Sequence, residues 1–115
     1  MKSFLIAANW KMNGDPLFIS DFMRDFSASY HRSPQQEIIF LPPFVYLRDV
    51  YAQISSLPQI YLGAQNVSEF AAGAYTGEIS PAMLKSVSCQ YVLVGHSERR
   101  TLFHETNQIA FQIKN

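Results

Sequence analysis

The sequence is poor in cysteine and in charge. Cys89 is the single cysteine among 115 residues, so no intrachain disulfide can form and a reducing compartment is favoured. Nine basic side chains balance nine acidic ones, so the chain lacks the basic excess that nucleic acid or an anionic membrane attracts. Charged residues reach only 16% and aromatic residues 14%. This composition favours extensive burial, part of it against something outside this chain.

Long hydrophobic runs are also absent. The N-terminal run, residues 4–8, turns polar at Asn9 and is too short for a signal-peptide core. No other run is long enough to cross a membrane. A glycine-rich phosphate loop is missing as well, which counts against a flavodoxin-like phosphate binder. We therefore expect a soluble, cytoplasmic protein with neither a membrane nor a nucleic acid as partner.

What the sequence does contain is a recurring short apolar run that never alternates with polar residues. The runs are FLIAA (4–8), EIIFL (37–41), IYLGA (60–64) and YVLVG (91–95). Continuous runs of this length are typical of strands buried on both faces, as in parallel sheets.

Helical patterns separate these runs. Asp15 before Pro16, and Ser80 before Pro81, each combine an N-cap with a proline at the first helical position. The expected helices cover residues 16–30, 44–56, 81–87 and 97–107, the last capped by Ser97, and another helical pattern follows at 108–114. An aromatic stripe at spacing four is expected to be the core side of the first helix: Phe18, Phe22, Phe26 and Tyr30. The alternation predicts an α/β fold with parallel strands and right-handed crossovers.

Polar residues follow the ends of the predicted strands, and in parallel α/β folds those ends share one rim. They are Asn9 and Lys11, then Gln65 and Asn66, then His96. His96 also stands where a helix begins, and the positive end of a helix favours a neutral imidazole that donates a hydrogen bond. A neutral donor beside the Lys11 cation suits stabilisation of an oxyanion.

Simpler interpretations remain open for each of these residues. His96 is, by position alone, more often a turn residue, and Lys11 a solvated loop lysine. Asn9 and Asn13 are ordinary turn formers. The charges of Glu98, Arg99 and Arg100 suit a solvated helix face.

Three stretches together resemble triosephosphate isomerase. They are AANWKMNG (7–14), GAQNVSEFAAGAYTGEIS (63–80) and YVLVGHSERRTLFHE (91–105), and GHSERR is the most specific part. The resemblance implies a (β/α)8 TIM barrel that interconverts dihydroxyacetone phosphate and D-glyceraldehyde 3-phosphate through an enediolate, in glycolysis and gluconeogenesis, without a metal or organic cofactor.

The resemblance also implies residue roles. His96 is the electrophile that polarises the carbonyl, and Lys11 supplies positive charge to the substrate and the enediolate. Asn9 binds substrate in the same pocket, while Glu98, paired with Lys11, and Ser97 support the site. The long segment 66–80 lacks a clear period, and in the family it reaches into a partner subunit of a homodimer. The implied dimer contacts are Gln65, Tyr75, Thr76 and Glu78.

A barrel of this class takes about 250 residues, so residues 1–115 are expected to be the N-terminal part of a single, incomplete barrel domain, supplying about four βα units. The glutamate base that the family uses after its sixth strand has no match here. We expect open edges at the first and fourth strands and no useful activity from the isolated chain. The alternative is a non-catalytic half-barrel that acts as a binding or assembly module.

Overall fold

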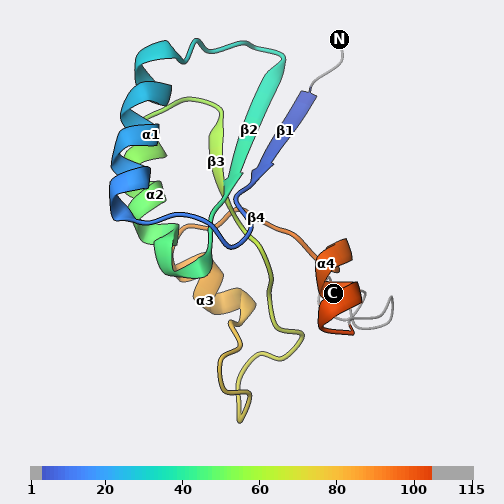
Figure 1. Ribbon diagram of the computed structural model, residues 1–115. Helices are drawn as coiled ribbons and strands as arrows, with labels where there is room; N and C mark the ends of the chain where they lie inside the picture. Colours follow the sequence, from blue (N-terminus) through green and yellow to red (C-terminus); the bar gives the residue numbers. More distant parts are fainter. Residues whose placement is uncertain (1–3, 105–115) are drawn as a thin grey trace.

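A four-stranded parallel sheet forms the centre of the protein. The computed structural model describes residues 4–104, in which the strands β1 (Phe4–Asn9), β2 (Gln36–Leu41), β3 (Ile60–Ala64) and β4 (Tyr91–Val92) lie in that order. Each neighbouring pair is parallel. The expected half-barrel, the first βα units of a TIM barrel, is therefore confirmed (Figure 1).

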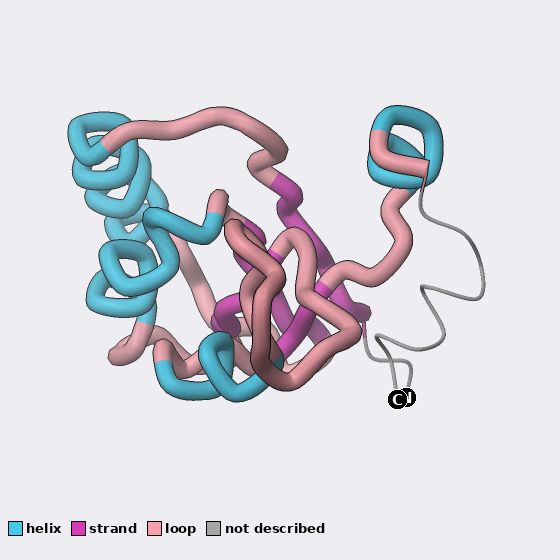
Figure 2. The backbone as a smooth tube through the Cα atoms, turned by 90° about the horizontal axis from the view of Figure 1, so that it is seen from below, coloured by secondary structure: helices cyan, strands magenta, loops and turns pink. Residues whose placement is uncertain are grey.

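Helices occur between the strands where the sequence predicts them. They are α1 (Pro16–Ser29), α2 (Leu47–Ile54) after a short 3-10 turn at Phe44–Tyr46, α3 (Pro81–Ser86) and α4 (Ser97–Leu102). Figures 1 and 2 show α1 and α2 side by side along the sheet, whereas α4 stands apart from the other helices.

Two of the three predicted helix caps are confirmed. The Asp15 carboxylate accepts a hydrogen bond from the Phe18 N–H at 2.8 Å, and the Ser80 hydroxyl accepts one from the Met83 N–H at 3.2 Å. The third was wrong, because His96 rather than Ser97 is the N-cap of α4. Since His104 adopts a positive φ of 58°, α4 ends at Leu102. The predicted continuation to residue 107 is therefore wrong at Phe103 and His104, whereas residues 105–107 and the pattern at 108–114 lie outside the described residues.

The fourth strand is shorter than predicted. Only Tyr91 and Val92 pair with β3, opposite Gly63 and Ala64, although the apolar run extends to Gly95. The reason is that β3 itself ends at Ala64, so the Leu93 N–H makes the last backbone contact, to the Ala64 carbonyl at 2.9 Å. Beyond it the chain turns through Gly95, whose φ is +63°.

The core lies between the sheet and helices α1 and α2. Its most buried members are Met23, Val50, Leu62, Leu47, Ile54, Phe40 and Ile19. On α2 the buried residues are Leu47, Val50 and Ile54, while Tyr51 lies exposed at the margin. Most of this core comes from α1, α2, β2 and β3, and Val67 and Leu84 add to it from beyond residue 65, so the two middle strands and these helices pack the body of the molecule.

The aromatic stripe of α1 is only partly the core that its spacing predicts. The fully buried residues of α1 are Ile19 and Met23, whereas Phe18 is exposed and Phe22, Phe26 and Tyr30 are half-buried. The rings stack on one another along the helix, with centroids 5.2–6.1 Å apart, and meet Phe40 or Trp10 edge-on. The stripe thus flanks the core instead of filling it.

Candidate active site

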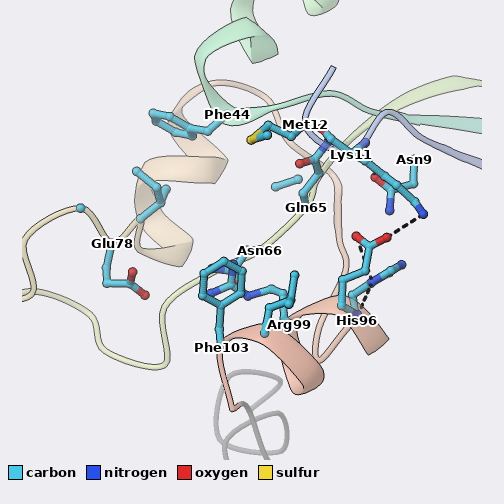
Figure 3. A pocket seen from close by; sticks show the side chains of 15 residues that line it. Asn9, Lys11, Met12, Phe44, Gln65, Asn66, Glu78, His96, Arg99 and Phe103 are labelled. Carbon is cyan, nitrogen blue, oxygen red and sulfur yellow. Dashed lines mark hydrogen bonds and ion pairs between the residues drawn. The ribbon is translucent and has the colours of Figure 1, made fainter. Parts of the chain in front are cut away.

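A cleft of about 580 Å³ opens at the carboxyl ends of the strands. It collects residues from all three strand ends that the sequence singles out, and Phe44, which follows β2, also lines it. Figure 3 shows Asn9, Lys11 and Gln65 along one side and His96, Arg99 and Phe103 along the other. The predicted rim therefore exists as one continuous surface.

Lys11 and Glu98 join the two sides of this cleft. The Lys11 Nζ lies 2.6 Å from the Glu98 Oε1, so the ion pair expected from the resemblance is present. The hydrogen bond from Lys11 is the main cause that lowers the pKa of the Glu98 carboxyl from its ordinary value, and the positive charge of Lys11 adds to it. Both side chains remain about half exposed, which leaves Lys11 accessible to a ligand in the cleft.

His96 is oriented by the helix it caps. Its Nδ1 accepts a hydrogen bond from the Glu98 backbone N–H at 3.1 Å. A ring nitrogen that accepts carries no proton, so this bond assigns the proton of the neutral imidazole to Nε2. Among residues 4–104 no hydrogen-bond partner is recorded for Nε2, so His96 presents a free N–H donor.

The loop that carries Lys11 is held in an unusual backbone conformation. Lys11 has a positive φ of 55°, which costs a non-glycine residue about 1 kcal/mol or more. Side chains stabilise it from both ends: the Asn9 Oδ1 accepts from the Lys11 N–H at 2.8 Å, and the Asn13 Nδ2 donates to the Trp10 carbonyl at 2.9 Å. Asn9 and Asn13 are thus turn formers, and Asn9 also keeps its Nδ2 donor at the cleft.

Gln65 ties this loop to the sheet. Its Nε2 donates to the Lys11 carbonyl and to the Leu41 carbonyl, each at 2.8 Å. One amide group therefore connects the segments that follow β1, β2 and β3. The sequence placed Gln65 on the rim but gave no indication of this bridging contact.

Exposed apolar side chains line both sides of the cleft, and no sequence pattern singled them out. Met12 and Phe44 lie on the side of Lys11 and Gln65, and Phe103, which follows Leu102 at the end of α4, lies on the side of His96. Met12 and Phe44 follow strand ends closely, which was a usable signal, whereas Phe103 was read only as part of a helix. Exposed apolar side chains next to the Lys11–Glu98 ion pair suit a ligand or partner that has both apolar and polar groups.

Residues 4–104 hold no group of three or more His, Cys, Asp or Glu side chains arranged to bind a metal ion. No helix in the same range is long and apolar enough to cross a bilayer. Cys89 is a free thiol near the core, and burial raises its pKa to about 11.

Comparison with known proteins agrees with this geometry. The family model described as Triosephosphate isomerase matches residues 4–114. The chain belongs to the triosephosphate isomerase family. Its relatives include the triosephosphate isomerases of Buchnera aphidicola, 46% identical over 112 residues, and of Coxiella burnetii, 44% identical over 111 residues.

The alignments cover nearly all of this chain but less than half of each relative. The alignment with the Buchnera protein covers 95% of this chain and 43% of that protein. The triosephosphate isomerase of Colwellia psychrerythraea is 43% identical, and its alignment covers 95% of this chain and 44% of that protein. Relative to its family, the chain therefore spans an N-terminal portion, in agreement with the four strands of the sheet.

Not every residue implied by the triosephosphate isomerase resemblance reaches the cleft. Asn9, Lys11, His96 and Glu98 line it. Ser97, at the first position of α4, is exposed and does not.

The segment 66–80 projects from the sheet (Figure 1). Glu78 lines the cleft, whereas Thr76 is exposed and does not. Tyr75 stacks on Phe70 at 4.0 Å, which gives the segment internal order.

Proposed function

We propose that this chain supplies the electrophilic half of a triosephosphate isomerase site, which interconverts dihydroxyacetone phosphate and D-glyceraldehyde 3-phosphate. One observation carries the proposal: Asn9, Lys11 and His96 share a single cleft, and the Nδ1 of His96 accepts from the Glu98 N–H, which leaves Nε2 as the hydrogen-bond donor. The chemistry of these groups supports carbonyl polarisation more than any other reaction.

In the proposed reaction a base removes a proton from the carbon beside the substrate carbonyl, and negative charge develops on the carbonyl oxygen. His96 Nε2–H donates a hydrogen bond to that oxygen, because Nδ1 is already committed to the Glu98 N–H. The Lys11 ammonium adds a positive charge, and its pair with Glu98 holds it at the cleft. The Asn9 Nδ2 is placed to donate to the same ligand.

We propose that neither of the two carboxylates that line the cleft among residues 4–104, Glu78 and Glu98, acts as the proton acceptor. Glu98, the acidic residue nearest His96, is paired with Lys11, and the resulting low pKa makes it a poor base. By the resemblance, the base follows the sixth strand of a complete barrel. We therefore propose that the isolated chain has no useful isomerase activity.

A homodimer of the complete protein, located in the cytoplasm, belongs to the same proposal. Tyr75 and Thr76 are exposed on the projecting segment 66–80. The apolar side chains that line the cleft, Met12, Phe44 and Phe103, are exposed as well. If the segment 66–80 of one subunit packed against these apolar side chains in the other, the contact would bury the segment and the side chains, and Gln65 would lie next to it.

A covalent chimera tests the proposed function. Residues 1–115 are fused to the remaining portion of the Buchnera relative, and steady-state isomerase turnover is measured. We expect turnover in the chimera and a loss of at least about 100-fold for Lys11→Met, because a charge aimed at the developing oxyanion is removed. The control is Lys85→Met, an exposed residue of α3 outside the cleft. A folded chimera without turnover, or equal effects of the two variants, contradicts the proposal.

A further inference from the structure

We propose that a second pocket, at the end of the sheet opposite the cleft, binds a small aromatic anion that also carries an N–H or O–H donor. The pocket has a volume of about 430 Å³ and lies between the carboxyl ends of α2 and α3, beside the start of β3. This volume falls within the range of small-molecule sites. The proposal is independent of the isomerase function proposed above, because no residue lines both the pocket and the cleft.

The pocket exists because β4 begins late. Tyr91, the first residue of β4, pairs with Gly63 near the end of β3. The first residues of β3, Ile60 and Tyr61, therefore pair with β2 on one side and have no strand beside them on the other. Both line the pocket, which occupies the space beside them.

One backbone acceptor faces this space. The Leu62 carbonyl accepts from the Gln90 N–H at 2.9 Å, and backbone groups two residues apart on a strand point the same way, so the Ile60 carbonyl points toward the pocket. Among residues 4–104 no hydrogen bond to the Ile60 carbonyl is recorded, although Ile60 is only 6% exposed. Because a buried carbonyl without a donor costs free energy, this position favours a ligand that donates an N–H or O–H.

The charge of the pocket favours an anion. Lys85, in the last turn of α3, is the only charged residue among residues 4–104 that lines the pocket, so no described carboxylate does. No ion pair of Lys85 occurs in the same range. The Cys89 thiol also lines the pocket, and burial raises its pKa to about 11, so it adds no negative charge at neutral pH. A carboxylate in this pocket therefore meets one ammonium group and no like charge.

Aromatic rings and an amide donor complete the lining. Tyr51 of α2 and Tyr61 of β3 both line the pocket, and Tyr61 packs against Tyr91 with ring centroids 5.7 Å apart. A flat aromatic ligand suits such side chains. The Gln59 Oε1 accepts from the Arg32 Nε at 2.8 Å, which leaves the Gln59 Nε2 as a donor to the ligand.

Two polar residues of the pocket stand where glycine would be less strained. Gln59 and Ser88, in the turns that enter β3 and β4, have φ of 63° and 68°, which costs a non-glycine residue about 1 kcal/mol or more. The Ser88 N–H donates to the Lys85 carbonyl at 3.0 Å, and the Cys89 N–H donates to the Leu84 carbonyl at 3.1 Å. These are the paired bonds of a Schellman motif, in which glycine is usual at the position of Ser88. In both turns the chain instead keeps a side chain that can hydrogen-bond to a ligand.

Titration with indole-3-acetate tests the proposal, because this probe combines a carboxylate, an aromatic ring and an N–H. Amide NMR spectra of the purified full chain should show saturable shifts centred on residues 54–62 and 85–90. Bound probe should also slow the alkylation of Cys89 by N-ethylmaleimide, a neutral reagent. We expect Lys85→Gln to weaken binding about fivefold, because an exposed ion pair is lost. The matched control is Arg48→Gln, which removes an exposed charge of α2 outside the pocket.

Two analogues of the probe separate its contacts. Indole-3-acetamide lacks the charge and N-methylindole-3-acetate lacks the N–H, and each should bind about threefold or more weakly than indole-3-acetate. Equal binding of either analogue, or equal effects of Lys85→Gln and Arg48→Gln, would overturn the proposal. So would shifts centred on the cleft instead of the pocket, or unchanged alkylation of Cys89 at a saturating concentration of the probe.

Discussion

Strands β2 and β3, with α1 and α2, differ sharply from the strands at the two ends of the sheet. In the first region Leu47, Val50 and Leu62 are almost fully buried, whereas Phe4 of β1, Tyr91 of β4 and Leu102 of α4 are exposed. The cleft nevertheless depends mainly on the exposed strands, through Asn9 and Lys11 at the end of β1 and His96 and Glu98 after β4. Among the described residues, the chain therefore packs the middle of its sheet firmly and leaves the elements that carry most of the site with few buried contacts.

The largest expected effect compares one substitution in the two regions. Leu62→Ala removes a side chain that is 0% exposed, and Leu102→Ala one that is 67% exposed. We expect Leu62→Ala to lower the free energy of unfolding by about 2–5 kcal/mol because it leaves a cavity. Leu102→Ala should change it by less than about 0.5 kcal/mol. Urea denaturation of both variants checks this, and similar losses would show that α4 is packed as firmly as the body.

Gly63 offers a second test within the packed region. A Cβ at this position would lie 2.7 Å from the Leu41 Cδ2 and 2.9 Å from the Ile39 Cγ2. We expect Gly63→Ala to lower the free energy of unfolding by about 1–3 kcal/mol through overpacking. Gly77→Ala, where no atom lies within 4 Å but φ is +91°, should cost only the backbone strain, about 1 kcal/mol. An unchanged unfolding midpoint for Gly63→Ala would refute the close packing.

Gln65 tests the connection between the two regions. Gln65→Glu replaces an amide donor that bridges the Lys11 and Leu41 carbonyls with a carboxylate that repels them. We expect a loss of about 1–3 kcal/mol in unfolding free energy and faster tryptic cleavage after Lys11, since the loop is released. Gln53→Glu, on the exposed side of α2, is the matched control. Equal cleavage rates in the two variants would contradict the bridging role.

The smallest expected effect is electrostatic. Lys11 lowers the pKa of Glu98 below its ordinary value, so the stabilisation from this group is present above the ordinary pKa and is lost as pH falls through the lowered one. Carboxyl chemical shifts followed by NMR should show the pKa of Glu98 rising toward its ordinary value in Lys11→Met and staying low in Lys85→Met. A pKa of Glu98 that is the same in Lys11→Met as in the parent chain would contradict the pairing.

The sequence was sufficient for the order of elements and for which residues share the rim, because strand ends in a parallel sheet meet at one edge. It also predicted the Asp15 and Ser80 caps, whose geometry depends on nearby residues alone. It failed at β4, whose length depends on where β3 ends, and at the cap of α4, because a histidine took the place expected for a serine. The bridge made by Gln65 joins segments distant in sequence, so no local pattern reveals it.

The most direct test of the central claim is steady-state turnover of the covalent chimera with and without His96. The comparison pairs His96→Gln with His31→Gln, an exposed residue before β2. We expect turnover to be reduced by about 100-fold or more for His96→Gln, because a flexible amide replaces the imidazole N–H whose ring is fixed by the Glu98 N–H, and to be unchanged for His31→Gln. Full turnover in a folded His96→Gln chimera would contradict it.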